Sequence, residues 1–134
     1  MQIRRSWLLC LLPLMLLLMG ARQAPLLDPD PIMIPEGVSS EQVAKEIKRA
    51  LIGRNWTITQ EQPGQIDSTL NLRAHVARIA VSYDAQRVSI RYVSSENLKF
   101  EQKKGERFIH KNYMSWINNV VGDLNRGLQM AALD

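Results

Sequence analysis

Cysteine is almost absent from this sequence. The chain of 134 residues contains one cysteine, Cys10, which lies inside an apolar run from Trp7 to Met19. If this run is removed as a leader, the remaining chain has no thiol, and it can form no disulfide, thiolate nucleophile or cysteine-ligated metal site. The fold must then be held together by its hydrophobic core alone.

Histidines and catalytic signatures are equally scarce. The two histidines, His75 and His110, fit no H-E-x-x-H or H-x-x-x-H spacing, which is the pattern typical of a helical metal site. Ser94 and Ser95 belong to no G-x-S-x-G nucleophile elbow. We therefore expect no metal, no cofactor and no enzymatic activity.

Outside the first 24 residues the chain has no large excess of positive or negative charge. The whole chain has 17 basic and 13 acidic side chains, but residues 1–24 hold three arginines and no acid. Without them the balance is 14 basic against 13 acidic side chains. A nearly neutral domain gives no reason to expect a nucleic-acid partner.

The first 24 residues have the layout of a secretory signal peptide. Arg4 and Arg5 precede the apolar run, and the small residues Gly20 and Ala21 follow it. The only cysteine lies within the run, so lipid attachment at its end is not expected. We predict an exported protein that is periplasmic or secreted.

The length of the apolar run favours cleavage over permanent anchoring. Its 13 residues would cover roughly 20 Å as a helix, whereas the hydrocarbon core of a bilayer is about 30 Å thick. We predict cleavage between about Met19 and Pro25. The alternative is an inner-membrane anchor formed by residues 7–20, which would be the protein's only membrane contact.

Residues 25–38 are rich in proline, with four between Pro25 and Gly37. Proline restricts its own backbone and that of the preceding residue, so this segment is predicted to be a semi-rigid spacer. A second interpretation places Ile32, Met33 and Ile34 along the domain as an extended edge segment.

The remaining residues, 39–134, are predicted to form one α+β domain in the order α-β-β-β-β-α. Ser39 and Gln42 have the spacing of a capping box at the start of a helix that ends at Gly53. Alternation of apolar and polar residues then predicts four strands joined by short turns. The expected sheet is a four-stranded antiparallel meander with both helices packed on one face.

Apolar residues at helical spacing predict the last helix. Because these residues form a broad stripe, they should cover the apolar face of the sheet, with Trp116 in the core. The stripe consists of Tyr113, Trp116, Ile117, Val120, Val121, Leu124 and Leu128.

Several short patterns resemble those of a group of small exported or lipid-anchored bacterial envelope proteins of unknown function. They are the tryptophan strand, PG.I, R.H.A, S.NL and IH.NY..W, spread over about residues 41–125. The resemblance implies an envelope location and this domain type, without implying a reaction. The chain departs from the group where many members have a lipoprotein cysteine, because it has Gly20 and Ala21 there.

Polar residues of these patterns are the candidate binding residues. His110 and Asn112 precede the last helix, where either can cap its free N–H groups, and Asn112 is the expected cap. A small polar pocket for a carboxylate, phosphate or peptide terminus is the alternative. The full set is Arg73, His75, Asn97, His110, Asn112 and Tyr113.

A second candidate surface is the outer face of the sheet, where Arg73, Arg78, Arg87 and Arg91 should emerge. The structural interpretation is a solvated face, and the functional one is a docking surface for an acidic partner or for the anionic polymers of the envelope. The segment 99–107, with charges of both signs, is expected to be an exposed mobile loop.

Our hypothesis is a non-enzymatic envelope module that binds an unknown protein or polymer; the alternative is a small-ligand-binding protein or enzyme that uses His110 and Asn112.

Overall fold

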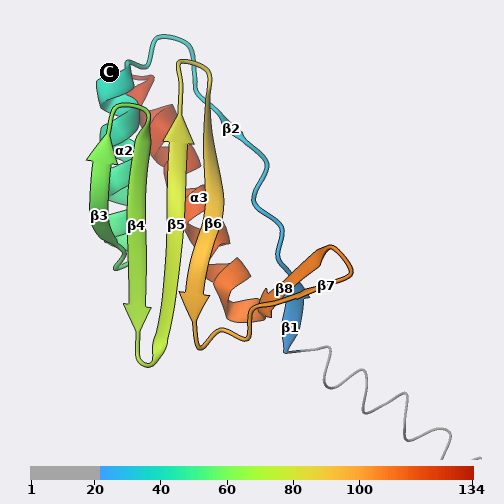
Figure 1. Cartoon of the computed structure of the whole chain (residues 1–134). Coiled ribbons are helices and arrows are strands. Elements are labelled where there is room, and N and C mark those ends of the chain that lie inside the picture. The colour runs from blue at the N-terminus through green and yellow to red at the C-terminus, as the bar shows by residue number, and fades with distance from the viewer. Residues whose placement is uncertain (1–21) are drawn as a thin grey trace, which may run out of the picture.

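The computed structural model describes residues 22–134 as an α+β domain with two helices and two antiparallel sheets (Figure 1). Most of the predicted signal peptide, residues 1–21, lies outside the described residues. Within residues 22–134, no helix is long and apolar enough to cross a membrane. The elements are β1 (Gln23–Pro25), β2 (Ile32–Met33), α2 (Ser40–Gly53), β3 (Thr57–Gln62), β4 (Gln65–Leu72), β5 (His75–Tyr83), β6 (Arg87–Glu96), β7 (Glu101–Lys103), β8 (Glu106–His110) and α3 (Lys111–Ala131).

The larger sheet has five strands in the order β2-β6-β5-β4-β3. Strands β3 to β6 are consecutive antiparallel neighbours, as an up-and-down meander requires. The four-stranded meander did not include β2, but the second interpretation of residues 25–38, an extended edge segment at Ile32–Ile34, agrees with it: Ile32 pairs with Val88 of β6 and is buried. A strand of two residues has no alternating pattern, so only the tertiary structure shows which strand it joins.

The smaller sheet, β1-β8-β7, was not predicted at all. The segment expected to be a mobile loop contains the β7–β8 hairpin, whose turn places both Lys104 and Gly105 at positive φ. Two consecutive residues at positive φ suit a tight hairpin, because the turn then follows the twist of the strands. Residues Gln23–Pro25 add to this hairpin through β8, so the chain just after residue 21 is held against the domain.

Both helices lie on one face of the five-stranded sheet (Figure 1). The capping box of α2 is present, with Ser39 and Gln42 each bonded to the other's backbone N–H. Helix α3 is 21 residues long and buries most of its apolar stripe against the sheet. Its buried residues are Tyr113, Ile117, Val120, Leu124, Leu128 and Ala131.

The longer α3 extends beyond α2 toward the end of the sheet where β4 ends and β5 begins (Figure 1). Near this end Trp56 forms part of the core and is 3% exposed. The apolar residues at the end of β4 are covered less completely, and Leu72 is 42% exposed. This incomplete cover gives the molecule a recess, which is the starting point for the candidate site.

Candidate functional site

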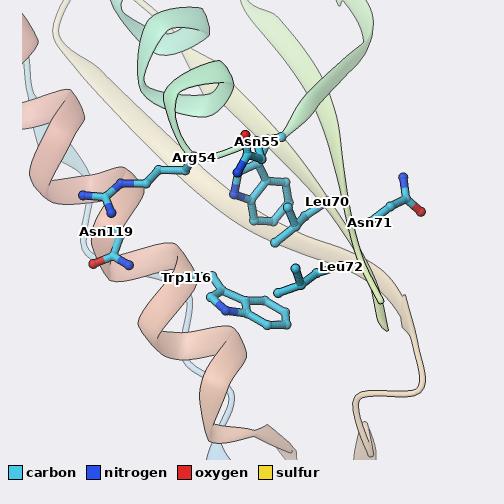
Figure 2. Close-up of a pocket in the computed structure, with 8 residues that line it drawn as sticks. Arg54, Asn55, Leu70, Asn71, Leu72, Trp116 and Asn119 are labelled. Carbon is cyan, nitrogen blue, oxygen red and sulfur yellow. The ribbon is translucent and has the colours of Figure 1, made fainter. Parts of the chain in front are cut away.

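A recess of about 340 Å³ lies between α3 and the end of β4, and we call it the groove (Figure 2). One wall is Trp116 of α3 and the opposite wall is Leu72, with Trp56 and Leu70 deeper in the core. The groove thus offers apolar surface between a helix and a strand end. Its lining residues are Arg54, Asn55, Trp56, Leu70, Asn71, Leu72, Trp116 and Asn119.

Trp116 is half-buried and packs against the core from its margin. The prediction that it is a core residue was therefore too strong. Ile117, the next residue, is 1% exposed and occupies the central position of the stripe. A step of one residue turns a side chain by about 100° around a helix, so Trp116 faces the groove instead of the sheet centre.

The backbone beside the groove has an unpaired strand edge. Pairing between β3 and β4 ends at Thr57 and Thr69, so within residues 22–134 Leu70, Asn71 and Leu72 have a strand neighbour only on the β5 side. Such an edge presents backbone N–H and C=O groups that another strand can use. The apolar groove and the open edge therefore lie next to each other.

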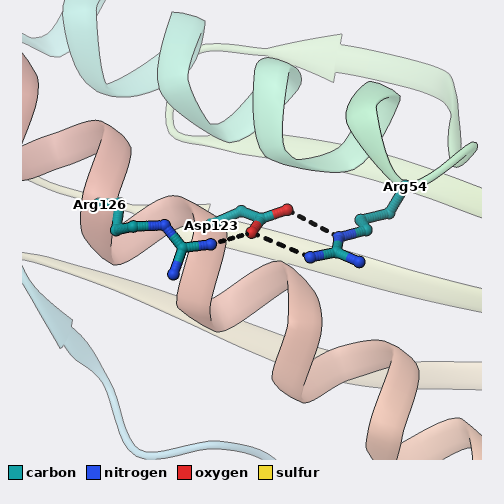
Figure 3. A network of polar contacts seen from close by, with 3 residues as sticks. All are labelled: Arg54, Asp123 and Arg126. Carbon is teal, nitrogen blue, oxygen red and sulfur yellow. Dashed lines mark hydrogen bonds and ion pairs between the residues drawn. The ribbon is translucent and has the colours of Figure 1, made fainter.

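An ion-pair network joins Arg54, which lines the groove, to α3 (Figure 3). The guanidinium of Arg54, just after α2, donates to both carboxylate oxygens of Asp123 on α3, at 2.8 and 3.2 Å. Arg126 donates to the same carboxylate at 2.5 Å. The hydrogen bond from Arg54 is the main cause that lowers the pKa of Asp123, so the carboxylate stays charged and joins the two helices.

A second polar cluster, the histidine corner, lies at the ends of β5 and β6 and the start of α3. His75 Nδ1 lies 2.7 Å from the carbonyl oxygen of Asn97, and because a carbonyl only accepts, Nδ1 donates; in a neutral ring Nε2 can then accept a hydrogen bond. His110 has the opposite arrangement, because its Nδ1 accepts a hydrogen bond from the Asn112 N–H at 3.1 Å. One imidazole can thus accept at Nε2 while the other can donate.

The environment of His110 favours its neutral form. Burial is the largest cause that lowers its pKa, followed by the nearby positive charges of Lys99, His75, Lys111 and Arg22. Neutrality is also what the cap needs, because a protonated Nδ1 could no longer accept the Asn112 N–H. Charge and hydrogen bonding therefore support the same protonation state.

The predicted corner residues are brought together only in part. His110, and not Asn112, is the N-cap of α3, and the Asn112 side chain is exposed in the first turn. The prediction for Asn112 was wrong because the helix begins earlier than the pattern suggested. Tyr113 belongs to the core, where burial raises its pKa and its ring meets Tyr92 edge to face.

Two other candidates near the corner have backbone roles. Arg73 has a φ of 56° in the turn between β4 and β5, and it is exposed there instead of on the sheet face. Asn97 has a φ of 59°, and its side-chain amide donates to the carbonyl of Ala74 at 3.5 Å. Both residues therefore shape the sheet end beside His75.

The outer sheet face carries the remaining predicted arginines. Arg78 donates to Ser94 and pairs with Glu96, which neutralises part of its charge. Arg91 lines a shallow depression of about 310 Å³ with Arg78, and Arg87 begins β6 beside the turn. In the described part of the chain, no group of three or more side chains has an arrangement that could hold a metal ion.

The groove was not predicted from the sequence. Its lining residues Trp56, Leu72 and Asn119 belong to none of the candidate sites that the sequence suggested. The available signal was the margin of the last helix, where Trp116, Asn119 and Asp123 recur at helical spacing beside the apolar stripe.

Comparison of the sequence with protein-family models finds no match, and neither curated proteins nor solved structures match the chain.

Proposed function

We propose that the protein is a non-enzymatic binding module of the bacterial envelope that takes an extended segment of a partner protein into the groove. The observation that carries the proposal is the open edge of β4 at Leu70–Leu72, directly beside the exposed side of Trp116. A partner strand at this edge would gain backbone hydrogen bonds and would place alternate side chains in the groove.

The chemistry of the lining suits a neutral peptide. Trp116 and Leu72 provide apolar contact, while Asn55 and Asn119 offer amide groups that can both donate and accept hydrogen bonds. Tryptophan is among the residues that contribute most to protein interfaces when a partner covers it. The charge of Arg54 is already engaged by Asp123, so the groove does not select for a strongly acidic segment.

Envelope location rests on the sequence of residues 1–24 and on the resemblance to envelope proteins. Fractionation of cells that express the full chain tests the envelope location independently of the groove. Recovery in the cytoplasm with an intact first residue would contradict export, whereas recovery with the periplasmic or membrane fraction is the expected result.

Site-specific photocross-linking tests the groove. A photoreactive amino acid at Asn119 should capture a partner in cells, and mass spectrometry should map the adduct to a contiguous peptide. The matched control is Asn118, which is exposed on the same helix but does not line the groove. Trp116→Ala should abolish the Asn119 adduct. Equal capture from Asn118 and Asn119, or adducts made only with glycan, would contradict the proposal.

The histidine corner supports a second candidate function, the binding of a small polar ligand. The specific observation is that the two Nδ1 atoms have opposite hydrogen-bond roles, so in their neutral forms one ring offers an Nε2 acceptor and the other an Nε2–H donor at the same end of the sheet. Nuclear magnetic resonance of the histidine rings during titration with small carboxylates and phosphates tests it. Saturable shifts of both rings are expected, and unchanged spectra would eliminate this candidate.

A further inference from the structure

Basic side chains from three separate segments meet at the end of the molecule that carries the histidine corner. Arg22 precedes β1, Lys99 lies between β6 and β7, and Lys111 begins α3; all three are exposed. We call these three side chains, together with His75 and His110, the basic face. The sequence does not show this grouping, because its members are spread over residues 22–111.

Backbone contacts hold the three segments in place. The Lys111 N–H donates to the carbonyl of Arg22 at 3.2 Å, and the Gln23 side chain donates to the carbonyl of Lys99 at 3.3 Å. The His110 N–H donates to the carbonyl of Leu98, whose side chain is 1% exposed. The basic side chains therefore project from a fixed frame and not from loose loops.

Among residues 22–134, none of the three basic side chains of this face forms an ion pair with a carboxylate. The acids nearest in sequence to Lys99 are Glu96 and Glu101, which pair with Arg78 and Lys103 respectively. The charged groups that act on His110 are all basic. A local concentration of positive charge thus exists within a domain whose total charge is close to zero.

We propose that the basic face docks on the anionic phospholipid surface of the membrane from which the protein emerges. Two observations select this partner: the positive charge, and the position of Arg22 three residues after the apolar run that ends at Met19. Lysine and arginine within a Debye length of anionic headgroups are attracted to them. Phe100, which follows Lys99 in the chain, stacks on Tyr92 and is 38% exposed, so part of its ring offers apolar surface next to Lys99.

The face remains suitable whether or not the leader is removed. An uncleaved apolar run would hold Arg22 close to the bilayer and would present the face to the headgroups. Cleavage just before Arg22 would instead create a new α-amino group at the face, which adds a further positive charge. Arg22, Lys99 and Lys111 do not line the groove, so this inference does not depend on the proposed peptide binding.

Lipid photocross-linking tests the docking. The full chain is placed in lipid nanodiscs of phosphatidylcholine and phosphatidylglycerol at a ratio of roughly three to one, which gives the surface a negative potential. A trace of the phosphatidylglycerol carries a photoreactive headgroup. We expect adducts within residues 97–99 and 110–112, and a steep loss of adducts at high salt because the attraction is screened.

Two double variants test whether the basic face carries the binding, and inorganic phosphate tests whether a soluble anion competes for it. Lys99→Gln with Lys111→Gln should lower adduct yield by about 30-fold, from the contribution of each basic residue at an anionic surface. Lys45→Gln with Arg49→Gln removes the same charge from α2 and should leave the yield unchanged. Equal yields from both variants would overturn the proposal. Full suppression by millimolar inorganic phosphate would also overturn it, because it would indicate a soluble-anion site.

Discussion

The imidazole of His75 lies beside the indole of Trp116, with ring centroids 6.3 Å apart and ring planes inclined at 53°. This contact places the groove and the histidine corner on two sides of one aromatic pair. His75 is fixed by its hydrogen bond to Asn97, so a movement of Trp116 would change the ring environment of His75 without disturbing the backbone.

A ligand in the groove should therefore be detected at His75. We expect the His75 ring signals to shift when a peptide that was identified by cross-linking is added, because the indole ring current acts over this distance. The His110 signals, which report the cap of α3, should change little. Equal shifts at both histidines would instead place the ligand in the corner.

Trp116→Ala should weaken partner binding strongly and stability only moderately. The half-buried indole should contribute about half of the ~3–5 kcal/mol that loss of a core tryptophan costs. Ile117→Ala, its neighbour in the core, should cost about 2–5 kcal/mol. Chemical denaturation of both variants measures which of them loses more free energy of unfolding. A greater loss for Trp116→Ala would show that its indole is a core group after all.

The cap of α3 should be sensitive to pH. The folded-state pKa of His110 lies below its ordinary value of about 6.5. The folded protein thus binds this proton less readily than the unfolded chain, and stability present above pH ~6.5 should be lost as the pH falls toward the folded-state pKa.

Variants of His110 and Asn112 isolate this effect. His110→Asn keeps a capping acceptor without a titrating group, so its stability should vary less between pH 7 and 5. Asn112→Ala should change stability by less than ~0.5 kcal/mol, because its exposed side chain is not the cap. Thermal unfolding across this pH range is the measurement, and an unchanged profile for His110→Asn would assign the pH dependence elsewhere.

Alkaline solution should destabilise the fold through Tyr113. Burial is the main cause that raises the pKa of its phenol, and Asp28 adds to the shift. Since the folded state disfavours the phenolate, stability present below the ordinary pKa of about 10 should be lost as the pH rises above it. Tyr113→Phe should remove this part of the alkaline loss. The measurement is the stability of both proteins at high pH, and an equal alkaline loss in Tyr113→Phe and the original chain would contradict a role for the phenol.

The first residue of a processed protein should lie at or before Arg22. A later cut would remove the hydrogen bond from the Lys111 N–H to the Arg22 carbonyl, and a cut beyond Gln23 would also remove part of the pairing of Gln23–Pro25 with β8. Intact-mass measurement of the protein from the envelope checks this. A mature chain that begins at Pro25 would show that β1 is dispensable.

The sequence alone determined the periodic parts of the fold. The capping box at Ser39 and the apolar stripe of the last helix predicted both helices, and alternation predicted β3 to β6. These patterns are local, because burial of one face of a helix or strand fixes which residues must be apolar. The resemblance to envelope proteins and the export signal remain predictions.

Only the tertiary structure decided which residues meet. Strands β1 and β2 are too short to show a period, and their partners β8 and β6 lie far away in the chain; β7 and β8 form a hairpin, but the charges of both signs in their segment hide it. The groove arises because the end of β4 extends past its pairing with β3 and is incompletely covered. The basic face arises because Arg22, Lys99 and Lys111 converge, whereas composition reports only a sum of charges. Periodicity is a property of residues close together in the sequence. The groove and the basic face depend instead on packing between distant segments, which no short stretch of sequence specifies.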